Sequence, residues 1–291
     1  MKIIYIAGDG RSGSTLLDSV LNNAEDSLSI GEFSRFWTRY LEGKSYCGCD
    51  DNIRKCNLWS KIISEIYDKF EISLEETEEK IFQIRFFKNF SNIDKYIEKP
   101  SWKIFCDLIK YVYKRISEIT NTTILIDSSK YPSWGYFLYK LNFAEFFFIH
   151  LERNLVDVAN SWKKTKLLPE YNGKVYMPIK SNFTILKSWI KIKYLCHKIS
   201  QVSDLKYVYI QYEDFCNDNS KYLNFFDEVF NLKISKTTLK FKFNHAIGGN
   251  PMRVQAEKLK IKKLKKDTSN LSYVEITIFE TCNFIVKKYY D

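Results

Sequence analysis

The sequence predicts an α/β protein of three layers, in which helices cover both faces of a central parallel sheet. Short apolar runs indicate the strands, because uninterrupted apolar runs are typical of parallel strands buried on both faces. We expect these strands at residues 3–7, 122–126, 145–151 and 206–210. Apolar residues at helical spacing fill much of the chain between them, most extensively over residues 58–120. The predicted fold therefore has a helical insertion, about 44–120, between its first two strands.

The composition is that of a folded chain with a basic charge. With 291 residues, 45% hydrophobic and 16% aromatic, the chain can bury a sizeable core. We find no repeat or linker that would divide it, so we expect a single domain over residues 1–291. Lys and Arg outnumber Asp and Glu by 45 to 35, a net charge of +10, which suits an anionic partner such as a nucleotide, a nucleic acid, an acidic glycan or a membrane surface.

The start of the sequence and its cysteine content predict the cellular compartment of the protein. The first strand begins at residue 3, which leaves no room for a signal peptide, and no stretch approaches the length of an uncharged membrane span. Seven cysteines, an odd number, are expected to be reduced thiols in a chain without a secretory signal. We therefore expect a cytoplasmic protein without a membrane span.

The loop after the first strand has the composition of a phosphate-binding turn. It reads GDGRSGST from Gly8 to Thr15 and leads into a helical pattern. Glycines let successive backbone N–H groups point inward, and the helix dipole adds positive potential there. The spacing is that of a Walker A loop, but Ser14 replaces its lysine and the cation comes earlier, at Arg11. This arrangement suits a single 5′-phosphate carrying a sulfuryl group better than the β- and γ-phosphates of a nucleotide triphosphate.

The segment RSGST, Arg11 to Thr15, matches the (R/K)-S-G-(T/S)-T loop of sulfotransferases that use 3′-phosphoadenosine 5′-phosphosulfate (PAPS). The chain therefore resembles this P-loop family, its bacterial members and the related tyrosylprotein and carbohydrate enzymes. The resemblance implies a three-layer αβα fold with the P-loop at the carboxyl edge of the sheet. It also implies that PAPS is the donor, that adenosine 3′,5′-bisphosphate is the product, and that the loop binds the donor through Gly10, Arg11, Ser12, Gly13, Ser14 and Thr15.

Glu32 is the candidate catalytic base. It precedes a short amphipathic pattern, and a carboxylate at the start of a helix is also explained by the helix dipole alone. Glu32 follows Arg11 by 21 residues, however, and the resembling enzymes carry their catalytic glutamate at this distance. The resemblance therefore implies that Glu32 takes the proton from an acceptor hydroxyl. His150 is the second candidate, although its place in an apolar run favours a packed histidine.

The second predicted strand ends in Asp127, and Lys130 follows three residues later. A hydrophobic strand ending in Asp is also typical of a Walker B motif. Asp127 is therefore the metal ligand in the alternative interpretation, a Mg²⁺-dependent P-loop nucleotide or small-molecule kinase. The phrase DSSKYP, from Asp127 to Pro132, resembles a sulfotransferase segment whose lysine reaches the transferring sulfuryl group. The resemblance implies that Lys130 has this role.

Arg153 and Ser161 are candidates for binding the 3′-phosphate. Arginine offers a two-pronged donor to phosphate, although Arg153 alone is equally explained by a surface ion pair. In the resembling family, an arginine after the third strand and a serine eight residues later bind this phosphate, and Arg153 and Ser161 have that separation. The YED phrase that starts at Tyr212 is similar to one whose tyrosine approaches the nucleotide.

A glycine-rich turn near the carboxyl end reads GGNPMR, from Gly248 to Arg253. Such a turn permits a strained backbone with inward amides, which is a nest for an anion. The resembling enzymes close a loop of this kind over the 3′-phosphate. The resemblance implies that Asn250 and Arg253 belong to the donor site, with Arg253 as the cation.

Three cysteines gather in the segment CGC…C, at Cys47, Cys49 and Cys56. They suggest zinc, but a tetrahedral structural site needs four ligands and no histidine lies nearby in the sequence. We therefore predict packed or occasionally oxidised thiols, and no metal site. A similar segment recurs in bacterial sulfotransferases.

These pieces predict a sulfotransferase that moves the sulfuryl group from PAPS to an acceptor hydroxyl by in-line transfer, without a metal. Glu32 is the predicted base, while Arg11 and Lys130 stabilise charge on the sulfuryl oxygens and on the leaving phosphate oxygen. The acceptor is a small molecule, a carbohydrate or another hydroxyl compound. A nucleic-acid-binding module is a third interpretation, but the basic run of residues 258–266 lacks the interleaved aromatic residues it requires, so we expect no nucleic-acid partner.

Overall fold

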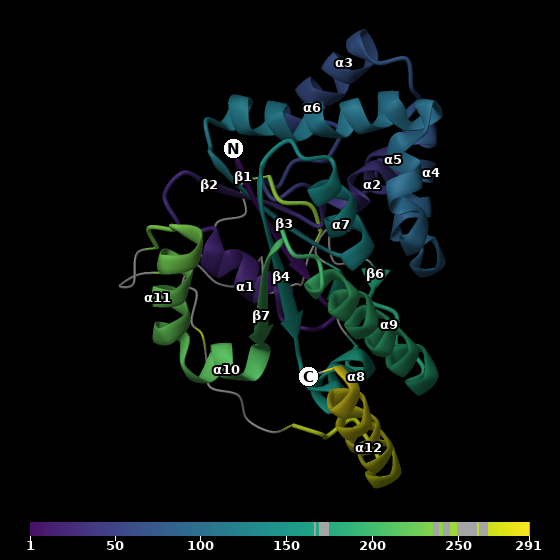
Figure 1. Cartoon of the computed structure of the whole chain (residues 1–291), viewed down its shortest axis with the longest axis vertical. Helices are drawn as coiled ribbons and strands as arrows, with labels where there is room; N and C mark the ends of the chain where they lie inside the picture. Colours follow the sequence, from purple (N-terminus) through teal and green to yellow (C-terminus); the bar gives the residue numbers. More distant parts are fainter. Residues whose placement is uncertain are drawn as a thin grey trace.

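The computed structural model describes most of the chain. The described residues are 1–165, 167–168, 175–234, 239–240, 245–248, 261 and 267–290. Within them, a five-stranded parallel sheet has the strand order β2-β3-β1-β4-β7 (Figure 1). Its strands are β1 Lys2–Ala7, β2 Ser27–Gly31, β3 Ile124–Lys130, β4 Glu145–Glu152 and β7 Lys206–Gln211. Because β1 lies in the middle, the loop that follows it opens where the chain order of the sheet reverses, which is where α/β proteins bind ligands.

Alternation along β1 sends side chains to the two faces of the sheet, as the strand period of two requires. Ile4 and Ile6 pack on one face with the helices α1 Ser14–Leu21 and α11 Asn219–Phe230. Tyr5 points to the opposite face, in a second buried cluster. The helices that contribute to this second cluster include α6 Lys103–Thr120, α7 Pro132–Lys140 and α9 Asn182–Ser200. Both faces are therefore covered, and the predicted three-layer αβα fold with a central parallel sheet is confirmed.

One detail of the predicted topology is wrong. The segment before Glu32, which is not among the strands expected from the sequence, forms the edge strand β2, whose residue Ser27 pairs with Ile124 of β3. Ser27 and Ser29 made this strand look polar, and its pairing partner lies about a hundred residues away. The helical insertion therefore follows the second strand rather than the first. Figure 1 shows it in the upper part of the view. Its helices are α3 Asn57–Lys69, α4 Leu74–Arg85, α5 Ile93–Glu98 and α6, with the short turns η2 Phe87–Asn92 and η3 Pro100–Trp102.

The remaining elements border the carboxyl edge of the sheet. Helix α8 Leu155–Lys163 packs with α9 and with the final helix α12 Tyr273–Tyr290 through a third apolar cluster. The remaining short elements are η1 Phe33–Arg35, α2 Phe36–Glu42, α10 Tyr212–Asn217 and the two-stranded ribbon of β5 Leu167–Leu168 and β6 Val175–Tyr176. In the part of the chain that the structure describes, no helix has the length and apolar character needed to cross a lipid bilayer.

Candidate active site

The carboxyl ends of the five strands meet at one edge of the sheet, and each end carries a predicted site residue. Arg11 lies in the loop after β1, Glu32 follows β2, Lys130 ends β3, Arg153 follows β4 and Tyr212 follows β7. These side chains line one cleft of about 450 Å³, a size typical of small-molecule sites. The predicted residues that line it are Gly10, Arg11, Gly13, Ser14, Thr15, Glu32, Lys130, Arg153, Ser161 and Tyr212.

One predicted residue that the structure describes, Ser12, does not line the cleft. The side chain of Ser12 is buried and borders a small neighbouring cavity instead of the cleft, and its backbone N–H donates to the carbonyl oxygen of Asp9 at 3.2 Å. Asn250 and Arg253 lie outside the described residues.

The loop after β1 contains two residues whose backbones adopt the left-handed conformation. Arg11 and Gly13 have left-handed φ angles of 73° and 94°. A side chain at Gly13 would be strained by this φ, and its Cβ would also lie 2.0 Å from the ring of Tyr212. Gly13 is the N-cap of α1, so the N–H groups of Ser14 and Thr15 stand in a first helical turn, where no intrahelical partner exists. The loop and the start of α1 therefore present N–H donors and positive potential to the cleft.

Arg11 is held in place by an aromatic ring that the sequence analysis did not single out. Its guanidinium lies 4.9 Å from the ring centroid of Trp162, and its Nη2 donates to Sδ of Met177 at 2.7 Å. Burial lowers the pKa of Arg11, and the nearby Glu32 opposes that effect. Lys180 also lines the cleft, and its Nζ lies 3.7 Å from the same Trp162 ring centroid. Trp162 directly follows the predicted Ser161 on α8, and this position could have identified it as a cleft residue from the sequence. Nothing in the sequence pointed to Lys180.

Arg153 joins the loop after β1 to the end of β7. Its Nη1 donates to the carbonyl oxygen of Arg11 at 3.2 Å, and its guanidinium lies 4.9 Å from the ring centroid of Tyr212. Trp189 fixes the backbone here, because its Nε1 donates to the carbonyl oxygen of Arg153 at 3.3 Å. Arg153 and Ser161 both line the cleft.

Several buried donors at the cleft have no hydrogen-bond partner among the described residues. They are Nε of Arg11, Nε of Arg153 and Nε1 of Trp162. Buried polar groups are normally satisfied, and leaving one unpaired is costly. All three residues line the cleft, so unpaired N–H donors beside it favour an anionic ligand.

Glu32 is buried beside a lysine and two arginines. Nζ of Lys130 donates to Oε1 of Glu32 at 2.5 Å, and Nε of Arg35 lies 3.3 Å from Oε2. Burial alone raises the pKa of Glu32, but the charges of Lys130, Arg35 and Arg39 outweigh it and lower the pKa to about 2. Glu32 is therefore a carboxylate at neutral pH.

The backbone around Glu32 is fixed by a distant segment. Gly31 has a φ of 68°, and a Cβ there would lie 2.4 Å from the carbonyl oxygen of Ile247. The N–H of Glu32 donates to that carbonyl oxygen at 2.7 Å, and the N–H of Ile247 donates to the carbonyl oxygen of Ile30 at 3.0 Å. Residues 245–248 therefore extend the edge of β2 and hold Glu32 at the end of the strand.

Asp127, the metal ligand of the kinase interpretation, and His150, the second candidate base, do not line the cleft. Both carboxylate oxygens of the fully buried Asp127 are used, since Oδ2 accepts from the hydroxyl of Tyr113 at 2.5 Å and Oδ1 from the N–H of Ser129 at 2.8 Å. His150 is buried, and its Nδ1 lies 2.9 Å from the hydroxyl of Tyr207. Burial, with a smaller effect of Lys193, lowers the pKa of His150 to about 3, so it is neutral at physiological pH. It is a packed histidine, as its sequence context favoured.

A second hollow of about 370 Å³ adjoins the cleft beside Glu32. It shares Arg35, Arg39 and Tyr131 with the cleft. Its other lining residues are Thr38, Glu42, Phe82, Arg85 and Phe86, from α2 and from the insertion helix α4 and its end.

No protein-family model and no curated protein matches this sequence. Solved structures do match the fold. The sulfotransferase domain of the Synechococcus PCC 7002 olefin synthase has a TM-score of 0.50 at 17% identity, over 97% of this chain and 94% of that one. The sulfotransferase domain from the curacin biosynthetic pathway has a TM-score of 0.53 at 16% identity, over 100% of this chain and 98% of that one. The chain therefore has the P-loop αβα fold of bacterial sulfotransferase domains.

Proposed function

We propose that this protein is a PAPS-dependent sulfotransferase, which transfers the sulfuryl group in line to an acceptor hydroxyl with Glu32 as the general base. One observation carries the proposal. The ends of the parallel strands bring the phosphate-binding loop, two arginines and a Lys130–Glu32 pair into the same cleft. This combination can hold a doubly phosphorylated nucleotide and can also accept a proton beside it.

The donor is held by N–H groups and cations. The first-turn N–H groups of α1 bind the 5′-phosphate, next to Arg11. Arg153 and Ser161 bind the 3′-phosphate, and Tyr212 lies between this pair and the loop. The unpaired donors of Arg11 and Arg153 fit such a ligand.

The reaction itself breaks the bond between sulfur and the bridging oxygen of the 5′-phosphate, and forms a bond between sulfur and the acceptor oxygen. Glu32 takes the proton that the acceptor hydroxyl loses. Lys130 and Arg11 offset negative charge on the sulfuryl oxygens and on the leaving phosphate oxygen. The work of the protein is positioning and charge stabilisation, as it is in phosphoryl transfer.

The Lys130–Glu32 pair also links donor binding to the strength of the base. A carboxylate whose pKa is about 2 is a weak base at neutral pH. When the sulfuryl oxygens attract Lys130, Glu32 loses its nearest positive charge, and burial then raises its pKa. Donor binding therefore activates the base, and the free enzyme keeps it paired.

The hollow beside Glu32 is the proposed acceptor site. Aromatic rings and guanidinium groups line it, and two of its arginines, Arg35 and Arg39, are those whose charges act on Glu32. An acceptor bound there brings its hydroxyl to Glu32 from the side away from the phosphate-binding loop.

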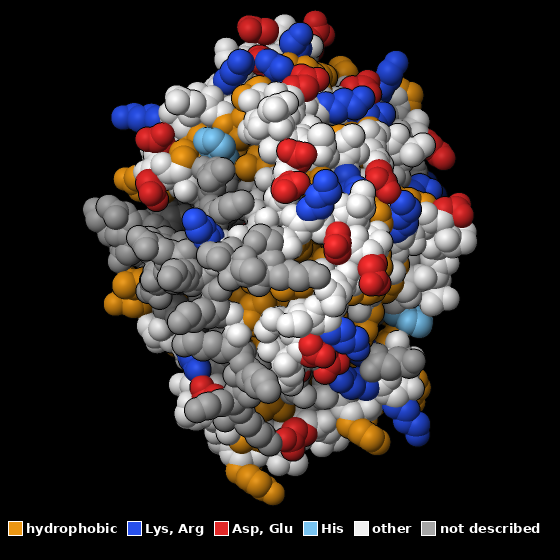
Figure 2. Space-filling view, turned by 90° about the vertical axis from the view of Figure 1, so that its left-hand side faces the viewer, with side chains coloured by type: hydrophobic (Ala, Val, Ile, Leu, Met, Phe, Trp, Pro, Cys, Tyr) orange, Lys and Arg blue, Asp and Glu red, His pale blue; other side chains and the backbone are white. Residues whose placement is uncertain are grey.

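The structure gives less support to the other two interpretations. A kinase needs a metal ligand at the phosphates, and Asp127 is instead buried and bonded to Tyr113 and Ser129. A nucleic-acid-binding module needs a continuous basic surface. Figure 2 shows one face of the molecule, on which the described Lys and Arg side chains are interspersed with Asp and Glu.

The test is to incubate the purified protein with PAPS and with panels of phenols, sugars and aliphatic alcohols, in a buffer with neither added Mg²⁺ nor chelator. We expect adenosine 3′,5′-bisphosphate and a sulfated product to form in equal amounts, measured by mass spectrometry. Transfer of a phosphoryl group from Mg²⁺-ATP to the same panels, with no sulfated product, would contradict the proposal.

A further inference from the structure

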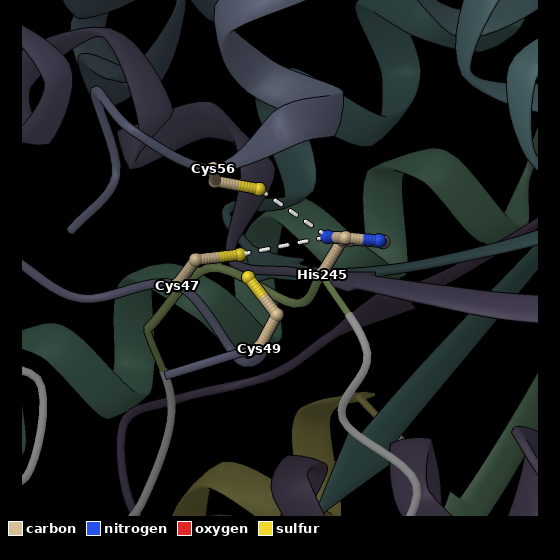
Figure 3. A group of neighbouring side chains, drawn as sticks. All are labelled: Cys47, Cys49, Cys56 and His245. Carbon is tan, nitrogen blue, oxygen red and sulfur yellow. Dashed lines mark hydrogen bonds between the residues drawn. The ribbon is translucent and has the colours of Figure 1, made fainter. Parts of the chain in front are cut away.

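Three cysteines and a histidine from distant parts of the chain converge away from the proposed active site. No histidine lies near Cys47, Cys49 and Cys56 in the sequence. The structure nevertheless places His245 beside them, although it follows Cys56 by 189 residues. Their ligand atoms all lie within 4.8 Å of one another. Figure 3 shows the three sulfurs turned toward each other and toward Nδ1 of His245, while the other ring nitrogen points away.

The distances match a tetrahedral site. With Zn–S bonds of 2.3 Å and a Zn–N bond near 2.0–2.1 Å, the ligand atoms of a regular tetrahedron are about 3.6 Å (N to S) and about 3.8 Å (S to S) apart. Nδ1 of His245 lies 3.3 Å from Sγ of Cys56 and 3.9 Å from Sγ of Cys47. These two distances lie within a few tenths of an ångström of the ideal value, and the other pairs, within 4.8 Å, need to close by no more than about 1 Å to surround one ion.

The surrounding structure holds these ligands in place. Cys56 is fully buried and Cys47 is nearly so. The N–H of Cys47 donates to the carbonyl oxygen of Asp51 at 2.8 Å, which closes the loop that carries two of the sulfurs. Nε1 of Trp59 donates to the carbonyl oxygen of His245 at 3.2 Å, and thereby ties the histidine backbone to α3, the helix that Cys56 caps. The site is thus supported from both of the chain segments that form it.

We propose that Cys47, Cys49, Cys56 and His245 bind one structural Zn²⁺ ion. Three thiolates and one imidazole nitrogen are a ligand set typical of structural zinc, and four protein ligands leave no open position for catalysis. On binding, the three thiols lose their protons to solvent and no electron is transferred. The zinc–ligand unit then carries a net charge of −1, two from the ion against three from the thiolates.

The zinc site would hold Glu32 indirectly. His245 lies two residues before Ile247, whose backbone hydrogen bonds fix Glu32 and Ile30. The N–H of Gly48, between two of the cysteines, donates to the carbonyl oxygen of Ala246 at 3.1 Å. Zinc would therefore clamp residues 245–248 between the cysteine loop and the end of β2. It acts through the backbone and does not touch the reacting atoms.

The first measurement is the metal content of the full chain purified without chelators, determined by inductively coupled plasma mass spectrometry. We expect one zinc per chain. Replacing the zinc with Co²⁺ should give the visible absorption of a tetrahedral, thiolate-ligated ion. The variants Cys56→Ser and His245→Asn should lose the metal, while the matched controls Cys282→Ser and His197→Asn should retain it.

Measurements on the wild-type protein test the proposal even if a variant does not fold. Wild-type protein that neither contains zinc nor takes up one equivalent of it under reducing conditions would overturn the proposal. So would a disulfide between two of the three cysteines in protein prepared without oxygen, or bound iron in place of zinc. Zinc content is measured without any sulfuryl transfer, so a failure of the zinc proposal can be told from a failure of the proposed function.

Discussion

Replacing Glu32 with Gln tests the role of the buried carboxylate both in catalysis and in stability. A general base contributes roughly 10²–10⁴ to the rate, so turnover should fall by that factor. Stability should fall as well. The pKa of Glu32 drops from its ordinary 4.5 to about 2, and at about 1.36 kcal/mol per unit this corresponds to on the order of 3 kcal/mol at neutral pH.

The pH dependence of that loss has a definite sign. Because the pKa of Glu32 is lower in the folded state, its contribution is complete above the unfolded value of 4.5 and is lost as pH falls toward 2. Chemical unfolding of both proteins should therefore show a stability difference at pH 7 that shrinks as pH falls below about 4.5. A difference that stays constant over this range would refute the ionised-pair account.

Glu65→Gln is the matched control. The pKa of Glu65 is also lowered to about 2, by hydrogen bonds from Arg115 and Tyr111, but it lies on α3 and does not line the cleft. Turnover should fall in Glu32→Gln alone, and both variants should still bind adenosine 3′,5′-bisphosphate, as judged by calorimetric titration. Near-normal turnover in Glu32→Gln would show that another group is the base.

Three further changes probe the cleft. Lys130→Met should lower turnover and move the acidic limb of the kcat/KM profile, which reports the free enzyme, to higher pH, because Glu32 loses its closest positive charge; an unmoved limb would contradict the pairing. Arg153→Ala should weaken bisphosphate binding by roughly 10- to 150-fold, the value of a charge-assisted hydrogen bond, while adenosine 5′-monophosphate, which lacks the 3′-phosphate, should lose little. Gly13→Ala should abolish donor binding, because its Cβ would clash with the ring of Tyr212, and calorimetry that finds unchanged affinity would refute this view of the loop.

Local patterns were sufficient to predict most of the fold. The strands β1 and β4 are continuous apolar runs, buried on both faces, so their sequences carry the signal by themselves. The strand β2 lacks that signal because serines alternate with apolar residues along it. Its place at the edge of the sheet depends on pairing with β3, which the sequence does not encode locally.

The candidate site likewise contains residues that local sequence patterns identified and residues that only contacts between distant segments bring in. Lys130 and Arg153 stand at the ends of predicted strands, and parallel strands bring their ends together, so their convergence followed from the predicted topology. Glu32 follows β2, which was not predicted, and was singled out through the family resemblance alone. The approach of His245 to Cys56 did not follow from the predicted topology, because contact between segments 189 residues apart depends on the packing of the whole chain. Lys180 reaches the cleft for the same reason.

The central claim is that the cleft binds a 3′-phosphorylated nucleotide, and thermal unfolding tests it most directly. The protein is unfolded with adenosine 3′,5′-bisphosphate in a buffer without added divalent metal, and separately with ATP in the presence and absence of Mg²⁺. A ligand at about a hundred times its Kd stabilises the folded state by roughly 2.7 kcal/mol, which for a chain of this size raises the Tm by on the order of 5 °C. We predict this rise with the bisphosphate and without added Mg²⁺. A rise seen only with Mg²⁺-ATP would contradict it and would make Asp127 the residue to mutate.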